Sequence, residues 1–361
     1  MSRVVLAMSG GVDSSVAACL LRQEGHEVIG VFMRHGQETE TACSTSTLSP
    51  RKQGCCSAAD AADARRVADS LGLPFYVINF QREFGQIVDY FVTQYTSGRT
   101  PNPCIVCNNW VKFGKLFEYA DSIGAQYVAT GHYARLKRQD DGQIALCRAR
   151  DDSKDQTYVL FGIKREVLSR LMFPIGDYRK DEIRRMATDF GLRVAEKPDS
   201  QEICFIPDQD HARFIRQRPD RVDTSGDIVT TKGEMVGKHD GYEQFTIGQR
   251  KGLKIAFGEP RYVLRIEPDT RRVVIGQREE LARSELIASG ANWLVKEDTL
   301  GPGMQCQVKI RYRGPAVPAI VEPSGLDRFR VKFLEPCYGV APGQAAVCYQ
   351  GHQLLGGGWI E

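Results

Sequence analysis

The sequence lacks several features that would set it apart from ordinary globular proteins. None of its apolar runs approaches the roughly 18 residues that a membrane-spanning helix needs, so we expect no membrane partner. Its net charge is only +3, because 48 Lys and Arg face 45 Asp and Glu, and no polybasic tail marks a partner. No signal or transit peptide precedes the apolar run that begins at Arg3, so we expect a cytoplasmic protein.

The sequence does contain eleven cysteines. A reducing cytoplasm opposes structural disulfides, so cysteines there more often serve redox or metal chemistry. Those within apolar or strand-like runs are predicted to be small buried hydrophobes: Cys19, Cys147, Cys306, Cys337 and Cys348. The others remain candidates for chemistry: Cys43, Cys55, Cys56, Cys104, Cys107 and Cys204.

The first 135 residues or so alternate short apolar runs with segments of helical period. This pattern predicts an α/β fold with a doubly wound parallel sheet. The polar, aperiodic stretch at 34–57 predicts a loop over the sheet edge. An amphipathic segment at 108–124 predicts a helix with Asn108 as its cap. The predicted strands are residues 3–8, 27–32, 75–80 and 127–131.

From about residue 207, alternating residues punctuated by Gly and Pro predict β structure. Residues 262–276 predict a hairpin that turns at Pro268-Asp269. Strands predicted at 305–312, 319–322, 328–334 and 344–349 indicate a small barrel or sandwich. We therefore expect an α/β domain over 1–207, a small central β-rich domain over 208–280 and a C-terminal β-barrel-like domain over 281–361.

A glycine-rich loop joins the first predicted strand to the following helix. Its sequence is Ser9-Gly10-Gly11-Val12-Asp13-Ser14-Ser15. Glycines let the backbone approach a phosphate closely, and amides at a helix N-terminus favour an anion. The serine hydroxyls add donors, and Asp13 can hold a magnesium ion or a loop amide. No Gly-Lys-Ser/Thr or GxGxxG motif is present, which excludes a Walker loop and a dinucleotide-binding turn.

This loop resembles the PP-loop of the N-type ATP pyrophosphatases, which cleave ATP between its α- and β-phosphates. Further motifs, spread over nearly the whole chain, are similar to those of the tRNA-specific 2-thiouridylase family. They are Phe32-Met33, Gly98-Arg99-Thr100-Pro101-Asn102-Pro103-Cys104-Ile105-Val106-Cys107-Asn108, Thr130-Gly131-His132-Tyr133-Ala134, Lys154-Asp155-Gln156-Thr157-Tyr158 and Asp199-Ser200-Gln201-Glu202-Ile203-Cys204-Phe205. The resemblance makes the first domain a PP-loop ATP pyrophosphatase domain with a tRNA-binding insertion.

The resemblance implies ATP-dependent 2-thiolation of the wobble uridine in tRNAs of the Lys, Glu and Gln type. A uracil carbonyl oxygen becomes a leaving group once it is adenylated, and magnesium with the loop amides would neutralise the departing pyrophosphate. AMP leaves when sulfur arrives. The residues that the resemblance assigns to ATP are Ala7, Met8, Ser9, Gly10, Gly11, Val12, Asp13, Ser14, Met33 and Gly131.

The resemblance makes Cys107 the nucleophile and Cys204 the carrier of the persulfide sulfur. A second thiol is needed to release sulfur from its carrier or to attack the activated base, which leaves a transient disulfide. A helix that begins at Asn108 would favour the Cys107 thiolate through its dipole. The persulfide also implies a sulfur donor, either a cysteine desulfurase or a sulfur-relay protein.

Cys104 departs from the family pattern, in which this position often carries Asp as an acid or base. The Cys104 thiol could stand in for that carboxylate in proton transfer, without any metal. Alternatively, Cys104, Cys107 and Cys204 could hold a [4Fe–4S] cluster with one open iron position, or zinc. Cys55 and Cys56 lie in the variable loop and are most simply incidental, with a sulfur relay or metal ligation as the alternative.

An enzyme that modifies one uridine must hold a folded RNA at several points and unstack the target base. The segment Lys309-Ile310-Arg311-Tyr312-Arg313 interleaves cations with an aromatic ring on a predicted strand, which suits phosphate and base. The residues that the resemblance assigns to tRNA are Asn102, Pro103 and Cys104 beside the target base, His132 and Gln344 in its discrimination, and Lys154, Asp155, Gln156, Arg311 and Tyr312 in further contacts.

Two rival functions share parts of this pattern. An amide-forming synthetase with the same loop would use adenylation followed by attack of an amine, but it needs no pair of cysteines. An RNA-binding protein could use ATP only to order a loop and would turn nothing over. Measuring pyrophosphate release with and without tRNA separates the three, and the placement of the cysteines favours tRNA thiolation.

Overall fold

The computed structural model describes residues 1–35, 57–199, 203–206, 208–253, 255, 257–296, 301 and 303–361. The chain divides into two compact units, Met1–Ile87 with Cys104–Gln209, and Val88–Pro103 with Asp210–Glu361. The second unit therefore includes a segment from the N-terminal third of the chain. Most of the loop predicted at 34–57 lies outside the described residues, together with Cys43, Cys55 and Cys56.

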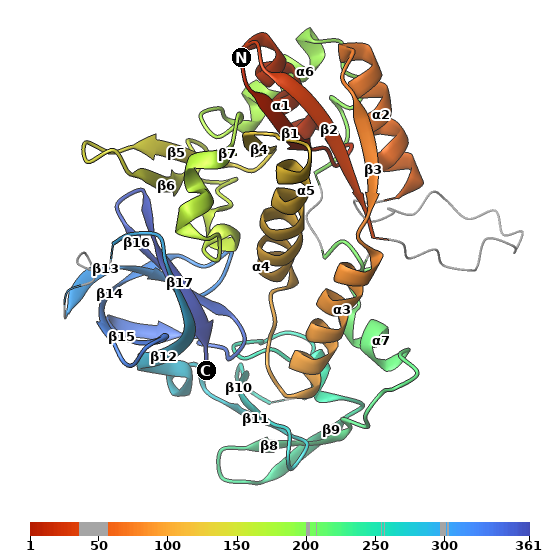
Figure 1. The fold of residues 1–361 in the computed structure, drawn as a ribbon. Helices are drawn as coiled ribbons and strands as arrows, with labels where there is room; N and C mark the ends of the chain where they lie inside the picture. The colour runs from red at the N-terminus through yellow and green to blue at the C-terminus, as the bar shows by residue number, and fades with distance from the viewer. Residues whose placement is uncertain are drawn as a thin grey trace, which may run out of the picture. The chain divides into compact units, whose positions relative to one another are not determined.

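The first unit contains a five-stranded sheet in which every pair of neighbours is parallel (Figure 1). The strand order is β3-β2-β1-β4-β7, so the chain changes direction between β1 and β4. Sheets of this kind bind ligands at the carboxyl ends of the strands beside such a switch point. The strands are β1 (Arg3–Ala7), β2 (Glu27–Arg34), β3 (Phe75–Asn79), β4 (Tyr127–Thr130) and β7 (Leu171–Met172).

The two faces of this sheet are covered, which confirms the predicted α/β fold. Leu6 packs in one cluster with Val16, Val67 and Ile183, which come from three helices. Val5 points to the opposite face, because side chains alternate along a strand, and it is also fully buried. The elements concerned and those around them are α1 (Val12–Gln23), α2 (Ala58–Leu71), α3 (Gln81–Thr96), β5 (Ala134–Arg138), β6 (Ile144–Arg148), η2 (Thr157–Leu160), η3 (Arg165–Arg170) and α6 (Lys180–Asp189).

The helix predicted to begin at Asn108 begins at Pro103 instead. Helix α4 (Pro103–Cys107) continues directly into the π-helix η1 (Asn108–Lys115), which continues into α5 (Leu116–Ser122). Proline suits the first turn of a helix, because its φ is already helical and no N–H is needed there. Asn108 is therefore not a cap. Its Nδ2 donates a hydrogen bond of 2.9 Å from within the helix to the carbonyl oxygen of Val159.

The second unit contains a four-stranded sheet with the order β10-β11-β8-β9. The hairpin predicted at 262–276 is confirmed, since β10 (Tyr262–Glu267) and β11 (Arg272–Gly276) pair antiparallel. Its core gathers around Ile228, Val263 and Val273. The other elements of this region are α7 (His211–Arg216), β8 (Gly226–Thr230), β9 (Met235–His239), η4 (Tyr242–Gln244) and η5 (Arg278–Leu281).

The C-terminal strands close into a six-stranded antiparallel barrel, one of the two predicted architectures. Neighbours pair in the order β12-β15-β14-β13-β16-β17, and β17 returns to pair with β12. The strands that close the barrel, β12 and β17, are not among those predicted from the sequence. The strands are β12 (Ala282–Trp293), β13 (Met304–Lys309), β14 (Ala316–Pro323), β15 (Arg328–Tyr338), β16 (Ala345–Gln350) and β17 (Gln353–Ile360).

The cysteines predicted to be hydrophobic are largely buried. Cys19, Cys147, Cys337 and Cys348 are buried, whereas Cys306 is half-buried. Burial raises the pKa of the Cys19 thiol to about 11, so this side chain is a neutral thiol at physiological pH. Four of these five cysteines are therefore buried as predicted.

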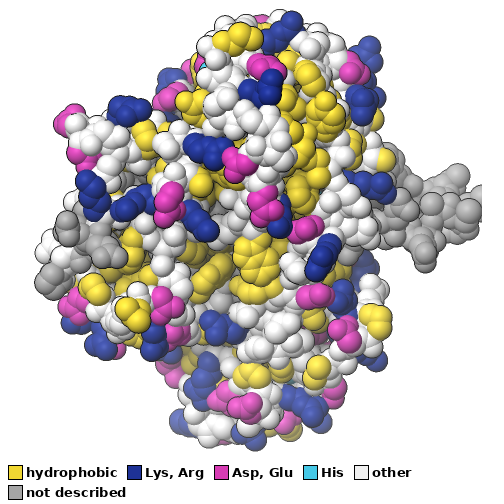
Figure 2. Space-filling model, in the orientation of Figure 1, with side chains coloured by type: hydrophobic (Ala, Val, Ile, Leu, Met, Phe, Trp, Pro, Cys, Tyr) yellow, Lys and Arg dark blue, Asp and Glu magenta, His cyan; other side chains and the backbone are white. Residues whose placement is uncertain are grey.

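The surface agrees with the small net charge of the sequence. In Figure 2, Lys and Arg side chains alternate with Asp and Glu side chains over the face that is drawn. Within the described ranges, no helix is both long and apolar enough to cross a membrane.

We predict that Gly356→Ala will destabilise the barrel. Gly356 has φ of +147°, and an added Cβ would lie 2.3 Å from the carbonyl oxygen of Asn292 on β12. Overpacking of this kind costs about 1–3 kcal/mol, so the midpoint of thermal unfolding should fall by several degrees.

Gly351→Ala is the matched control for the close approach of Gly356 on β17 to β12. Gly351 also has a left-handed φ of +58°, but an added Cβ would meet nothing within 4 Å. Gly351→Ala should suffer only the backbone strain of a left-handed φ, and it should lose less stability than Gly356→Ala. Equal losses in the two variants would contradict the close approach of β17 to β12.

Candidate functional site

The loop after β1 forms a backbone turn at the start of α1. Gly10 has φ of +71°, and an added Cβ would lie 2.2 Å from the carbonyl oxygen of Asp60, so only glycine fits. The backbone N–H of Ser9 donates to Ser14 Oγ at 3.2 Å, which holds the turn closed. Among the described residues, no side chain caps α1. The first turn of α1 therefore offers its amides to an anion.

Gly131 borders the same turn from the end of β4. An added Cβ at Gly131 would lie 2.8 Å from the backbone nitrogen of Ser14, so a larger residue would fill the space beside the first turn of α1. The carboxyl ends of β2, β1 and β4 are neighbours in the sheet. This edge brings together the residues predicted to bind ATP: Ala7, Met8, Ser9, Gly10, Gly11, Val12, Asp13, Ser14, Met33 and Gly131.

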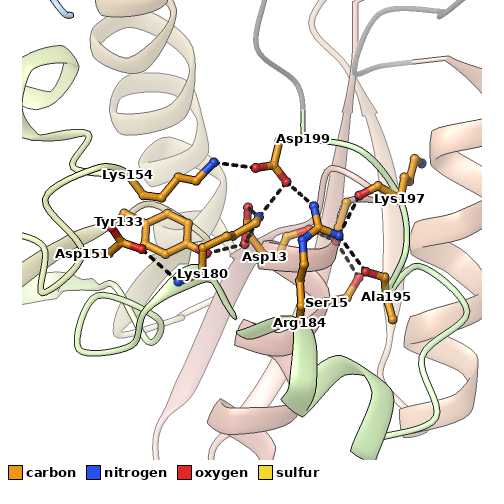
Figure 3. A network of polar contacts seen from close by, with 12 residues as sticks. Asp13, Ser15, Tyr133, Asp151, Lys154, Lys180, Arg184, Ala195, Lys197 and Asp199 are labelled. Atoms are coloured by element: carbon orange, nitrogen blue, oxygen red, sulfur yellow. Dashed lines mark hydrogen bonds and ion pairs between the residues drawn. The ribbon is translucent and has the colours of Figure 1, made fainter. Parts of the chain in front are cut away.

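A network of charged side chains lies against this loop (Figure 3). Lys180 Nζ donates to both carboxylate oxygens of Asp13 at 2.8 Å, and it also pairs with Asp199 Oδ1 at 2.8 Å. Tyr133 Oη donates to Asp13 Oδ1 at 2.8 Å. Burial and the charge of Asp13 raise the pKa of Tyr133, so its phenol remains a donor. Asp13 is thus held by a lysine and a tyrosine from distant parts of the chain.

Asp199 forms the second centre of this network. Its carboxylate accepts hydrogen bonds from Lys154 Nζ and Arg184 Nη2, each at 2.8 Å, in addition to its contact with Lys180. Burial acts to raise the pKa of Asp199, but the hydrogen bonds from Lys154 and Lys180 outweigh it and hold that pKa below its ordinary value. Asp199 is therefore an ionised acceptor shared by three cations.

Lys180 is a residue of this network that the sequence does not predict. It lies 167 positions from Asp13, and its sequence surroundings are those of an ordinary charged helix start. The backbone N–H of Lys180 donates to Asp151 Oδ2 at 3.0 Å, and its side chain is only 10% exposed. No local pattern marks such a residue, because its role depends on a contact between distant segments.

Lys197 fixes the loop to α2. Its Nζ donates to the carbonyl oxygen of Gly10 at 2.9 Å, to Asp60 Oδ1 at 2.6 Å and to Asp63 Oδ2 at 2.7 Å. Burial would lower the pKa of Lys197, but the hydrogen bonds to Asp60 and Asp63 outweigh it and raise that pKa. The charged lysine therefore stabilises the left-handed turn at Gly10.

The two cysteines of the Cys-x-x-Cys segment lie on α4. Cys104 is exposed and Cys107 is half-buried. A spacing of three residues places them on the same side of the helix. Because the helix begins at Pro103, Cys107 lies one turn inside it and not at the helix start that was expected to favour its thiolate. A π-helical segment follows Cys107 directly, a feature often found at functional sites.

Cys204 is half-buried in the short described segment 203–206. The neighbouring Phe205 packs edge-on against Phe84, with ring centroids 5.6 Å apart, and Phe84 stacks on His35 at 3.9 Å. Since His35 follows β2, these rings connect the Cys204 segment with the carboxyl end of β2. A meeting of Cys204 with Cys107 remains a prediction.

The described part of the chain has no group of three His, Cys, Asp or Glu side chains that could hold a metal ion. Cys104, Cys107 and Cys204 are thus not a preformed set of three thiolates, and we derive no step through a cluster. Asp13 supplies one carboxylate at the loop. Mg²⁺ commonly binds one or two carboxylates together with substrate phosphates, so Asp13 fits such a site once ATP is present.

The motif Lys154-Asp155-Gln156 shapes its own loop. Asp155 is buried. Its carboxylate accepts hydrogen bonds from Thr157 Oγ1 at 2.8 Å and from the backbone N–H of Ala149 at 3.1 Å. Gln156 Oε1 accepts the backbone N–H of Tyr133 at 2.8 Å. The Asp155 and Gln156 side chains therefore bind protein groups in this structure, and their contact with tRNA remains a prediction.

His132 lies in the core of the first unit. Its ring is buried, it lies beside Phe113 and Phe173, and its Nδ1 is 2.7 Å from Thr130 Oγ1. Burial, assisted by nearby Lys112, holds the pKa of His132 well below its ordinary value. A neutral, buried ring supports a structural role, and its predicted part in tRNA discrimination remains untested.

Gln344 holds the segment that leads to α4. Its Nε2 donates to the carbonyl oxygens of Thr100 at 2.9 Å and Pro101 at 3.4 Å. The backbone N–H of Thr100 donates to the carbonyl oxygen of Pro342 at 2.8 Å. These contacts fix the backbone immediately before Asn102, one of the residues assigned to tRNA.

Arg311 and Tyr312 lie in a turn and not on the predicted strand, because β13 ends at Lys309 before a Gly-Pro pair. The Arg311 guanidinium donates to the carbonyl oxygens of Gly339 and Ile247. Tyr312 is 37% exposed, and Lys309 Nζ lies 5.7 Å from its ring centroid. The cation and the ring are thus adjacent at the surface, whereas Arg311 is engaged by the backbone.

Three family models match the chain in succession. The tRNA methyl transferase HUP domain matches residues 2–208, the tRNA methyl transferase PRC-barrel domain matches residues 213–277, and the aminomethyltransferase beta-barrel domain matches residues 283–360. Among solved structures, a 4-thiouridine synthetase–RNA complex with bound ATP has a TM-score of 0.37 and 16% identity, covering 60% of this chain and 50% of that chain.

Two relatives match the chain from end to end. The tRNA-specific 2-thiouridylase MnmA of Rhodopirellula baltica is 54% identical over 385 residues, covering 100% of this chain and 96% of the relative. The tRNA-specific 2-thiouridylase MnmA of Geotalea uraniireducens is 48% identical over 360 residues, covering 99% of this chain and 95% of the relative. The chain therefore belongs to the family of the tRNA-specific 2-thiouridylase MnmA.

Proposed function

We propose that this chain uses ATP and a cysteine persulfide to convert the wobble uridine of tRNAs of the Lys, Glu and Gln type into 2-thiouridine. The observation that carries the proposal is the end-to-end similarity to thiouridylases, 54% identity over 100% of the chain. The cradle at Gly10 and Gly131 supports an ATP site, because both positions exclude a side chain beside the start of α1. We also propose a division into domains at 1–207, 208–280 and 281–361, close to the ranges of the three matching family models.

In the first step, the carbonyl oxygen at C2 of the uracil attacks the α-phosphorus of ATP. An O–P bond forms, the bond to the β-phosphate bridge breaks, and pyrophosphate leaves. Amides at the start of α1 stabilise the negative charge that develops on the phosphates. Mg²⁺, which Asp13 would hold together with phosphate oxygens, supplies further charge neutralisation when bound. Met33 and Gly131 border the adenine end of this site.

In the second step, the Cys107 thiolate attacks Sγ of the Cys204 persulfide. A bond forms between the two cysteines, and the bond from Cys204 to its terminal sulfur breaks. The terminal sulfur takes the electron pair and attacks C2 of the adenylated base, so AMP leaves with the former carbonyl oxygen. The resulting disulfide is a two-electron oxidation of the protein, which a cellular thiol reductant must reverse before the next cycle.

Recognition of tRNA is spread over both units. Lys154 borders the ATP loop through Asp199, while Lys309 and Tyr312 offer a cation beside an exposed ring in the second unit. Such a pair suits a phosphate and a stacked base. Gln344 donates a hydrogen bond to the carbonyl oxygen of Thr100, just before Asn102. Asn102 would lie beside the target base.

We predict that Asp13→Asn will lower tRNA-dependent pyrophosphate release by about 100-fold or more, because the carboxylate that would hold Mg²⁺ at the phosphates is lost. Affinity for tRNA should stay within about twofold, since Asp13 contacts Lys180 and Tyr133, neither of which is among the residues assigned to tRNA. A filter-binding measurement provides that control. Release of pyrophosphate at the wild-type rate would show that the loop assignment is wrong.

Cys107→Ser and Cys204→Ser should each abolish 2-thiouridine formation without unfolding the protein, because neither thiol is fully buried. Mass analysis of the nucleosides of modified tRNA measures the product. The matched control is Cys348→Ser, in which a hydroxyl replaces a thiol in the barrel core with 0% exposure. That variant should lower the thermal midpoint and still form 2-thiouridine. The mechanism is excluded if either active-site variant keeps normal product formation.

Cys104 distinguishes the two interpretations of its thiol. If Cys104 transfers a proton, Cys104→Asp should retain substantial activity, because a carboxylate performs the same task without metal. If Cys104 is a cluster ligand, Cys104→Ala should lose iron and activity together. Iron and sulfide analysis after anaerobic purification accompanies both assays. An active, iron-free Cys104→Asp protein would refute the cluster, and an inactive one beside an iron-loaded, active wild type would refute the simple persulfide route.

A further inference from the structure

The phosphate loop contains no lysine of its own, yet a lysine lies against it. Residues 9–15 are Ser, Gly, Gly, Val, Asp, Ser and Ser, so their only charged side chain is the carboxylate of Asp13. A triphosphate bound at the start of α1 would bring further negative charge to this carboxylate. The Asp13 carboxylate and the phosphates would repel each other strongly where water is limited, so a cation is needed between them.

We propose that Lys180 contacts the phosphates of ATP and that Asp199 is the positioning residue that holds it there. The inference rests on the proposed function and deepens it. Lys180 Nζ lies 2.8 Å from both carboxylate oxygens of Asp13, which is in the first turn of α1. An ammonium group has three donors, and the close contacts of Nζ in this structure are oxygens of Asp13 and Asp199.

The position of Lys180 is fixed from both ends of its side chain. Its backbone N–H donates to Asp151 Oδ2 at 3.0 Å at the start of α6. At the other end of the side chain, Nζ lies 5.7 Å from the ring centroid of Tyr133, whose hydroxyl also donates to Asp13 (Figure 3). With only 10% of the side chain exposed, Lys180 is ordered before a ligand arrives. Preorganised cations of this kind stabilise phosphoryl charge without reorganising.

Asp199 lets Lys180 change partners without being stranded. When a phosphate group takes one donor of Nζ, the contact with Asp199 Oδ1 can remain while a contact with Asp13 is released. Asp13 is then free to act on the phosphates together with a divalent cation. Asp199 acts through Lys180 and itself needs no contact with ATP.

The test compares the affinity of ATP with that of adenosine, each measured by calorimetry on the full chain without tRNA. Lys180→Met should weaken ATP binding by about 10- to 100-fold, the usual effect of one charge-assisted hydrogen bond, and leave adenosine binding within about twofold. A purely structural lysine would instead affect both ligands or neither. Lys180→Gln, which keeps a hydrogen bond to a carboxylate but lacks the charge, carries the same expectation if Lys180→Met does not fold.

Arg184→Met is the matched control. Arg184 also pairs with Asp199 at 2.8 Å, but its other hydrogen bonds go to the carbonyl oxygens of Ala195 and Lys197 and not to the loop at 9–15. ATP affinity of this variant should stay within about threefold of the wild type. The inference is overturned if the Lys180 variants bind ATP normally or if Arg184→Met loses as much affinity as they do. Failure of the wild-type chain to bind ATP would instead refute the proposed function.

Discussion

The candidate site depends on the ion pair between Asp13 and Lys180. Lys180 is only 10% exposed, so its charge must be matched by the carboxylates around it. The pair connects the start of α1 with the start of α6, two elements 167 positions apart in the sequence. Through Asp199 the same lysine is linked to Lys154. Removing Asp13 would leave Lys180 paired with Asp199, and removing Lys180 would leave Asp13 with its hydrogen bond from Tyr133, so each partner keeps one contact within the network.

A second constraint is the space beside the first turn of α1. Gly10 and Gly131 both approach backbone atoms so closely that an added Cβ would lie within 2.8 Å of them. Lys197 then holds the carbonyl oxygen of Gly10 while it pairs with α2. The two glycines keep side chains away from the amides at the start of α1, and Lys197 and Lys180 hold the loop in place. An anion site needs both exposed amides and a rigid backbone.

The sequence predicts the elements whose signals are local. Buried parallel strands are continuous apolar runs, so β1, β2 and β4 are predicted from residue order alone. The edge strand β3 is also an apolar run, although Tyr76 and Val77 are exposed. β17 was missed because its three glycines, 356–358, are typical of a turn, whereas here they allow close approach to β12. The helix start at Pro103 has no unambiguous local signal, because proline is typical of extended segments as well as of the first turn of a helix. Lys180 left no local signal at all.

The course of the chain adds a final physical link. Residues Val88–Pro103 belong to the second unit, whereas the chain from Cys104 onward belongs to the first. Gln344 of the second unit holds the carbonyl oxygens of Thr100 and Pro101, and the covalent backbone continues from there into the helix of Cys104 and Cys107. Gln344 can therefore influence the cysteines through the backbone that it holds. A change in this side chain can alter the position of the Cys107 thiol without any contact with it, because the helix begins shortly after the segment that Gln344 holds.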